Sequence, residues 1–233
     1  MKVPQVKEYY DILEKKRLSL AVKRFFDVTA SAVMLVVLAP VFAVIAAAVK
    51  KDSKGPVFFR QERVTRYGRH FRIFKFRTMV DNADKMGTQV TVGGDGRITR
   101  VGHIIRKYRL DELSQLIDVF RGTMTFVGTR PEVPKYVEHY TPEMRATLLL
   151  PAGVTSEASI IFKDEDKLLE SSSDIDGTYV REILPKKMKY NLKAIREFSL
   201  MNDLKIMLAT VGAVLGIGSG SNKCTKKRKA ARQ

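Results

Sequence analysis

Two adjacent carboxylates, Asp111 and Glu112, follow a run of cations that contains Arg106, Lys107 and Arg109. Apolar residues recur after them at helical spacing, so both carboxylates are predicted in the first turn of a helix. The helix dipole favours their ionised forms there, although acidic residues also take this position simply as caps. An ionised carboxylate among cations can bind a divalent metal ion, or attack a phosphorus atom whose negative charge has been neutralised.

The charge balance of the chain points to a polyanionic partner. The 233 residues include 42 Lys and Arg against 25 Asp and Glu, which gives a formal net charge of +17. Nucleic acid, an anionic membrane surface and phosphorylated substrates all fit such an excess. Because Cys224 is the only cysteine, no intrachain disulfide can form, and a cysteine-based metal site is not expected.

A long apolar segment near the N-terminus predicts membrane association. Residues 28–49 contain no charged side chain, and a helix of this length would measure about 33 Å. Cations lie on both sides of the segment, including Lys23 and Arg24 before it, so the positive-inside tendency places both ends on the cytoplasmic face. Pro40 favours a break inside the segment. We therefore expect a re-entrant helix–break–helix hairpin, with an ordinary single span as the alternative. Asp27, near Lys23 and Arg24, is interpreted as a member of an ion pair at the membrane interface.

The basic stretch that follows is predicted to form a β-hairpin. Cations recur at every third residue from Arg60 to Lys75, and residues 71–77 alternate partly between strong β-formers and cations, with a turn expected near Gly68. Such a face suits lipid headgroups or a diphosphate. Cations interleaved with aromatic residues also suit nucleic acid, so a membrane-tethered nucleic-acid-binding module without catalysis is the rival hypothesis. That rival offers no reason for the acidic pair.

Seven short motifs, in this order and spacing, resemble those of bacterial sugar transferases of the monotopic phosphoglycosyl transferase superfamily. The motifs are Lys23–Asp27, Ser53–Gln61, Phe74–Met79, Arg97–Gly102, Leu110–Leu113, Phe126–Glu132 and Asp203–Ile206. The resemblance implies transfer of a sugar-1-phosphate from a nucleotide diphosphate sugar, usually a UDP-sugar, to polyprenyl phosphate, with UMP released. It also implies that such an enzyme starts the synthesis of a lipid-linked glycan, such as a capsule or exopolysaccharide.

The resemblance also assigns roles to site residues. Asp111 is expected to be the nucleophile, to carry the phosphosugar covalently, and to bind Mg²⁺, the expected cofactor. Glu112 is its partner in placing the metal or handling a proton. Arg106 and Arg130 match basic positions of the family, and Lys75 and Arg77 fall in its Lys-Phe-Arg motif, so all four are expected to bind phosphate. The residues 153–159 depart from the family pattern, and no sugar identity is therefore predicted.

The predicted organisation has three parts. Residues 1–52 form a basic N-terminal segment and the re-entrant hairpin, and residues 53–222 form a compact α/β (α+β) catalytic domain. Residues 223–233 form a basic disordered tail. The resemblance implies a monotopic protein of the bacterial inner membrane with its catalytic domain on the cytoplasmic face. The expected partners are the nucleotide sugar, polyprenyl phosphate and the membrane, but no nucleic acid. A second copy of the chain, in a homodimer, is a further candidate partner.

Overall fold

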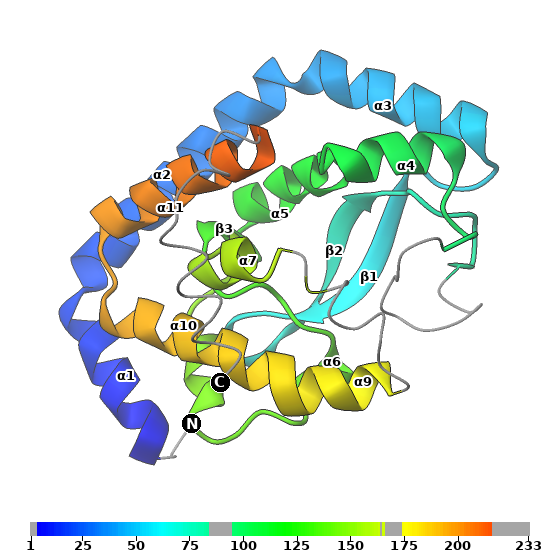
Figure 1. Cartoon of the computed structure of the whole chain (residues 1–233). Coiled ribbons are helices and arrows are strands. Elements are labelled where there is room, and N and C mark those ends of the chain that lie inside the picture. Colours follow the sequence, from blue (N-terminus) through cyan, green and yellow to red (C-terminus); the bar gives the residue numbers. More distant parts are fainter. Residues whose placement is uncertain (1–3, 84–94, 164, 166–173, 216–233) are drawn as a thin grey trace.

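The computed structural model describes residues 4–83, 95–163, 165 and 174–215. The predicted basic tail, residues 223–233, lies outside these ranges. Within these ranges the fold combines helices with two small two-stranded sheets. The predicted combination of helices and strands is therefore present, but the strands of the described residues form no larger sheet. Helices, rather than a large central sheet, form most of the framework (Figure 1).

The strands are short and form two separate pairs. They are β1 (Phe58–Val64), β2 (His70–Phe76), β3 (Met124–Val127) and β4 (Ala152–Thr155). The longer helices are α1 (Pro4–Lys15), α2 (Arg17–Val37), α3 (Ala39–Asp52), α4 (Arg100–Lys107), α10 (Leu184–Arg196) and α11 (Leu200–Leu215). Shorter helical segments connect them: η1 (Arg66–Gly68), η3 (Leu110–Gln115), α5 (Leu116–Arg121), α6 (Pro134–Val137), η4 (Met144–Leu149), α7 (Glu157–Ile161), α9 (Ile175–Thr178) and the π-helix η5 (Tyr179–Ile183).

The apolar segment forms two helices with a sharp bend, as the sequence predicted. Helices α2 and α3 meet at Leu38 at an angle of 63°. Pro40 is in the first turn of α3, where its missing N–H is tolerated, but it cannot donate to Val36 and so prevents α2 from continuing. Among the described residues no unbroken helix has the length and apolarity needed to cross a bilayer, whereas this bent pair meets both criteria when its halves are taken together.

Helix α2 has the reverse of the polarity expected for a helix on a water-exposed domain. Asp27 and Ser31, one turn apart, are buried against the protein. Apolar side chains on the opposite side are open, and Phe25, Val36 and Val37 are 73%, 76% and 68% exposed. Helices α4 and α5 lie along the inner side of α3 and α2 (Figure 1). An apolar outer face of this size marks an interaction surface.

The basic stretch forms the predicted antiparallel hairpin. Strands β1 and β2 pair from Phe58 opposite Phe76 to Val64 opposite His70. The turn uses left-handed backbone at Tyr67 and Gly68, with φ of 60° and 73°. The hairpin is fixed beside the bent helices because Phe76 packs on α3, in a cluster with Ile45, Val49 and Ile105.

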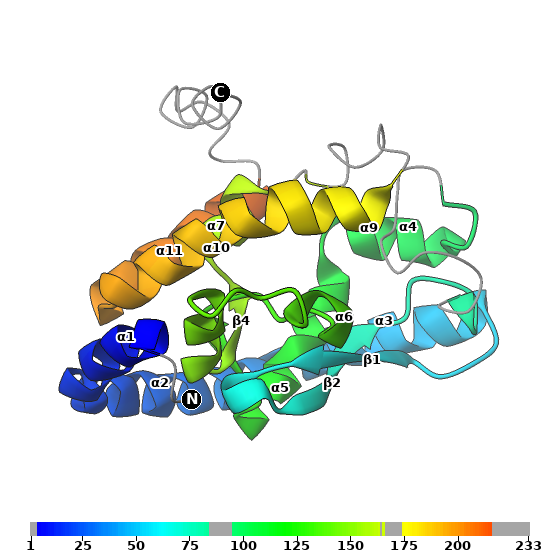
Figure 2. The same cartoon turned by 90° about the horizontal axis from the view of Figure 1, so that it is seen from below.

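The second pair, β3 and β4, is parallel and lies where several helices converge. Both strands contact α11, and β3 also contacts α2 and α5. Figure 2 shows α10 and α11 along one side of the molecule, with α2, α3 and the β1–β2 hairpin along the other. The segment that follows β3, residues 128–133, is thereby held between the hairpin and α10. It carries Arg130, whose guanidinium donates to Glu112.

Candidate active site

The acidic pair lies at the start of the short helix η3. Helix α4 ends at Lys107, and Arg109 then adopts left-handed backbone with φ of 53°. Such a conformation is uncommon for a non-glycine residue and often accompanies functional sites. It redirects the chain so that Asp111 and Glu112 occupy the first turn of η3, which is a 3₁₀-helix that continues into α5.

Glu112 is bound by two cations. Both oxygens of its carboxylate accept from the guanidinium of Arg130, and the ammonium of Lys75 lies 3.9 Å from Oε1. Burial opposes ionisation of Glu112, but Arg130 and Lys75 outweigh it and lower the pKa of this carboxyl to about 2. Glu112 is therefore a fixed anion that positions Arg130 and Lys75.

Asp111 is different, because no hydrogen bond or ion pair of its carboxylate is found among the described residues. Its backbone carbonyl accepts from the Ser114 hydroxyl, which fixes the main chain of the first turn. Burial raises the pKa of Asp111, while Lys75 opposes that shift and the charge of Glu112 adds to it. Burial likewise lowers the pKa of Lys75 to about 8, against the attraction of Glu112. Asp111 is thus a carboxylate that lies close to cations but is bound by none of those that the structure describes.

Two of the predicted phosphate-binding arginines differ in their placement. Arg106, at the end of α4, donates from Nε to the Thr78 hydroxyl at 2.9 Å and acts electrostatically on Asp111. Arg77 lies just past the end of β2 and is buried. It donates to the carbonyls of Ser53 and Lys54, both at 2.7 Å, so it fastens the loop after α3.

Gly55 allows this fastening. Its φ is +121°, and a Cβ at this position would lie 1.9 Å from the Arg77 guanidinium. The structure therefore brings together Asp111, Glu112, Lys75, Arg130 and Arg106, and does not place Arg77 with them.

The interpretation of Asp27 as an interfacial ion pair is wrong. Asp27 is only 2% exposed, and its Oδ2 accepts from the Thr125 hydroxyl on β3. Lys23 pairs instead with Asp203 of α11 at 2.5 Å, and Arg24 donates to the carbonyls of Val119 and Phe120. Sequence proximity suggested the pair, but Lys23 finds its partner on α11 and Arg24 finds its partners on α5.

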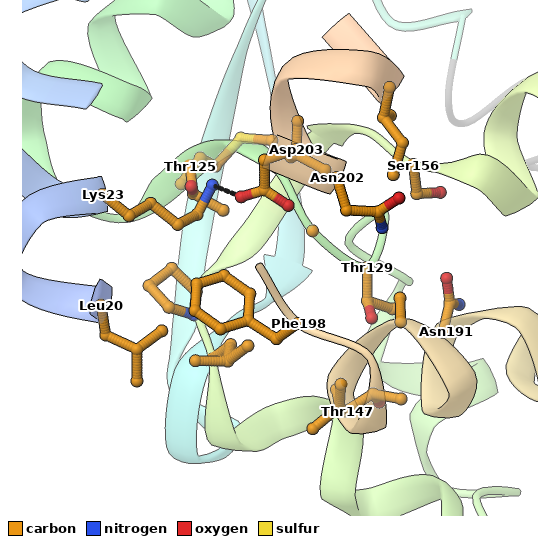
Figure 3. Close-up of a pocket in the computed structure, with 18 of the residues that line it drawn as sticks. Leu20, Lys23, Thr125, Thr129, Thr147, Ser156, Asn191, Phe198, Asn202 and Asp203 are labelled. Atoms are coloured by element: carbon orange, nitrogen blue, oxygen red, sulfur yellow. Dashed lines mark hydrogen bonds and ion pairs between the residues drawn. The ribbon is translucent and has the colours of Figure 1, made fainter. Parts of the chain in front are cut away.

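A pocket of about 150 Å³ lies between α2, β3, α10 and α11 (Figure 3). The Lys23–Asp203 ion pair crosses it, with Phe198, Thr125 and Asn202 nearby. Its lining includes none of the five residues that meet around the acidic pair. The pocket is therefore a separate feature, in which the ion pair joins the start of the bent helices to α11.

The structure also reveals charged residues behind Arg130 that sequence reasoning did not select. Glu132 and Lys187 are both buried, and the Tyr179 hydroxyl donates to Glu132. Arg63 donates to the carbonyl of Pro131 at 3.1 Å. Glu132 is the last residue of the Phe126–Glu132 motif, so the sequence did offer a signal that this residue matters. Lys187 lies in a polar helical stretch with many other lysines, and nothing in its local sequence distinguishes it.

Magnesium fits this site as a partly protein-bound ion. Among the described ranges no three His, Cys, Asp or Glu side chains converge to form a complete metal site. Mg²⁺ characteristically uses one or two carboxylates together with substrate phosphates and water. The carboxylate of Asp111 forms no ion pair with a cation of the described chain, so it is available to bind Mg²⁺.

A carboxylate among fixed cations is an arrangement that can bind phosphate groups, and in this chain it lies beside a bent apolar helix pair. The chain belongs to the bacterial sugar transferase family, whose model matches residues 18–216. This match confirms the resemblance seen in the motifs.

Several characterised relatives share about one third of their residues with this chain. A UDP-N-acetylgalactosamine-undecaprenyl-phosphate N-acetylgalactosaminephosphotransferase of Aeromonas hydrophila is 33% identical over 85% of the chain. UDP-glucose:undecaprenyl-phosphate glucose-1-phosphate transferases of Caulobacter vibrioides and Escherichia coli are each 36% identical, over 83% and 81% of it. These matches cover 45%, 69% and 39% of the three relatives, so the chain spans less than half of the first and the third.

Proposed function

We propose that this chain transfers a sugar-1-phosphate from a UDP-sugar to polyprenyl phosphate and thereby starts the synthesis of a lipid-linked glycan. The observation that carries the proposal is the contrast inside the acidic pair, where Glu112 is held by Arg130 while Asp111 has no bonded cation among the described residues. The names of the relatives support both substrate classes. Because those names differ in the sugar, the proposal extends to the class of UDP-sugars and to no single one.

In the proposed first step, an oxygen of Asp111 attacks the phosphorus that bears the sugar. The bond from this phosphorus to the oxygen bridging the two phosphates breaks, and UMP leaves with that oxygen. The phosphosugar remains on Asp111 as an acyl phosphate. In the second step, an ionised oxygen of polyprenyl phosphate attacks the same phosphorus, and the bond to Asp111 breaks. The soluble sugar nucleotide and the lipid therefore react in turn at one carboxylate.

The surrounding cations make the attack of an anion on an anion feasible. Lys75, Arg106 and Arg130 lie around the acidic pair and can lower the repulsion between Asp111 and the diphosphate. When Mg²⁺ is bound, it supplies further charge neutralisation on the phosphate oxygens. The chain's own part is to keep Glu112 ionised, so that Arg130 and Lys75 stay beside Asp111.

We further propose that α2 and α3 enter the cytoplasmic leaflet of the bacterial inner membrane and leave it on the same face. The outward apolar side chains of α2, the bend of 63° and the cations at both ends of the segment support this placement. A lipid phosphate can then reach the catalytic residues without crossing the bilayer.

The test is to incubate the full chain in detergent or vesicles with Mg²⁺, undecaprenyl phosphate and a panel of UDP-sugars, and to measure the nucleotide released. We expect UMP, and a loss of about ten-thousandfold or more in Asp111→Asn. Mass spectrometry without lipid acceptor should find a phosphosugar on Asp111. Release of UDP would contradict the proposal, and so would retention of nucleic acid in a salt-dependent manner without turnover.

A further inference from the structure

A second group of buried charges lies directly behind the candidate active site. Lys187 of α10 is 5% exposed at its side chain, and its ammonium lies 3.4 Å from Glu132 Oε1 and 3.1 Å from Glu165 Oε2. The hydroxyl of Tyr179 donates to Glu132 at 2.5 Å and accepts from Lys187 at 2.9 Å. One lysine is thus the shared ion-pair partner of two carboxylates, of which Glu132 is 7% exposed and Glu165 is 26% exposed at the side chain.

A local irregularity of the helix places Tyr179 and Lys187 on the same side. In an α-helix, residues eight apart are about 80° out of line, whereas residues seven apart nearly coincide. The π-turn η5, residues Tyr179–Ile183, adds one residue to the turn and removes this offset. Pro185 accounts for the irregularity, because it has no N–H to donate to the carbonyl of Arg181.

The group is joined to Arg130 through a short, well-fixed segment. Glu132 is two residues beyond Arg130, and its backbone carbonyl accepts from the N–H of Val64 at 3.0 Å. Arg63 fixes the intervening residue by donating to the Pro131 carbonyl. The main chain on the C-terminal side of Arg130 is therefore anchored, and movement of this arginine is confined largely to its side chain.

Three carboxylates act on the Arg130 guanidinium. Glu112 raises the pKa of Arg130 most, and Glu165 and Glu132 raise it further. Although burial disfavours the charge of Glu132, Lys187 and the Tyr179 hydroxyl lower the pKa of this carboxyl, so it remains an anion. Without Lys187, Glu132 and Glu165 would lose their shared counter-ion, and the remaining cations coupled to Glu132 by charge are Arg63 and Arg130.

We infer that Lys187 is a positioning residue, which neutralises Glu132 and Glu165 and so leaves Arg130 bound to Glu112 beside the nucleophile. The inference rests on the proposed function for its consequence on turnover. The competition of Glu112 with the rear carboxylates, Glu132 and Glu165, for the Arg130 guanidinium does not depend on the reaction.

The experiment compares Lys187→Met with Lys193→Met, a control on the same helix whose exposed lysine pairs with Glu197 at the surface. We expect kcat for UMP release to fall about a hundredfold in K187M and to stay within about threefold of the unmodified chain in K193M. Arg130 binds Glu112 in the unmodified chain. A crystal structure of K187M should show the Arg130 guanidinium turned away from Glu112 and toward Glu132 and Glu165.

A neutral variant separates positioning from simple loss of folding. Lys187→Met combined with Glu132→Gln and Glu165→Gln contains no unpaired rear charge, so it should restore kcat to within about threefold and return the Arg130 guanidinium to Glu112. This variant also serves if K187M alone does not fold. An Arg130 that still binds Glu112 in the K187M structure overturns the inference, and so does a hundredfold loss that persists in the neutral variant. Absence of UMP release from the unmodified chain would contradict the proposed function instead, while the structure of K187M still tests the role of Lys187.

Discussion

In two regions of this molecule, carboxylates and cations come together with different outcomes, at the pocket between α2 and α11 and around η3. In the pocket between α2 and α11, Lys23 and Asp203 bind each other directly, and the neighbouring carboxylate of Asp27 accepts from Thr125. Around η3, Glu112 takes up Arg130, while the adjacent Asp111 makes no such bond within the described chain. The first arrangement joins two helices, and the second leaves one carboxylate available.

The difference shows what a reactive carboxylate needs from its surroundings. Cations must be near enough to lower the repulsion of an incoming phosphate, yet they must be held by another anion so that they do not bind the nucleophile. Glu112 fulfils that second condition. Neighbouring acidic residues with the same charge therefore have different tasks, set by which one the guanidinium of Arg130 reaches.

The largest effect should come from removing the cation that distinguishes the two carboxylates. Arg130→Gln is expected to lower kcat by about a hundredfold to a thousandfold, because a charge that stabilises the transferring phosphate is lost. Burial then acts on Glu112 against the charges of Lys75 and Arg109, so the pKa of Glu112 should rise and the acid limb of the pH–rate profile should move to higher pH. Steady-state UMP release across pH measures both changes. A profile identical to that of the unmodified chain would contradict this role.

Breaking the Lys23–Asp203 ion pair between α2 and α11 should lower the stability of the fold and leave turnover nearly unchanged. Lys23→Met leaves Asp203 partly buried without its cation, and we expect a loss of about 3 kcal/mol in the free energy of unfolding. Adding Asp203→Asn should recover most of that loss. For the folded fraction of either variant, kcat should remain within about threefold. Denaturant titration in detergent measures the stability, and the UMP assay measures kcat. A large fall in kcat without a fall in stability would contradict a purely structural role for this ion pair.

The smallest effect concerns protonation of Lys75. Burial lowers the pKa of this lysine to about 8, so its positive charge is present below that pH and lost above it. The rate of UMP release should therefore fall as pH rises through about 8, by up to about tenfold per unit. Lys75→Arg should move this alkaline limb to higher pH, since a guanidinium stays charged. An alkaline limb that is unmoved in the arginine variant would assign the titration to another group.

Much of the fold was predictable because its signals are local. The bend near Pro40, the hairpin between residues 58 and 76, and the position of the acidic pair at a helix start each depend on a short stretch of sequence. The expectation of an α/β domain was less accurate. Strand propensity identified β-formers, but the strands pair only in twos, and helices supply most of the packing.

The roles of individual charges were harder to predict because they depend on tertiary contacts. Arg77 lies in the same motif as Lys75, but β2 ends between them, and the side chain of Arg77 turns to the loop after α3. Asp27 lies near two cations in the sequence and contacts neither. Lys187 is 55 residues from Glu132, and such a contact leaves no trace in local composition.

The π-turn at Tyr179–Ile183 makes the relative direction of Tyr179 and Lys187 depend on the number of residues between them. Deleting one residue from this turn would leave Tyr179 seven residues before Lys187, and an ordinary α-helix brings residues at that spacing onto the same side. The contact of Tyr179 with Glu132 should therefore survive such a deletion. Inserting one residue would instead rotate Tyr179 by about 100° relative to Lys187 and turn it away from Glu132, although every side chain of the buried group would still be present.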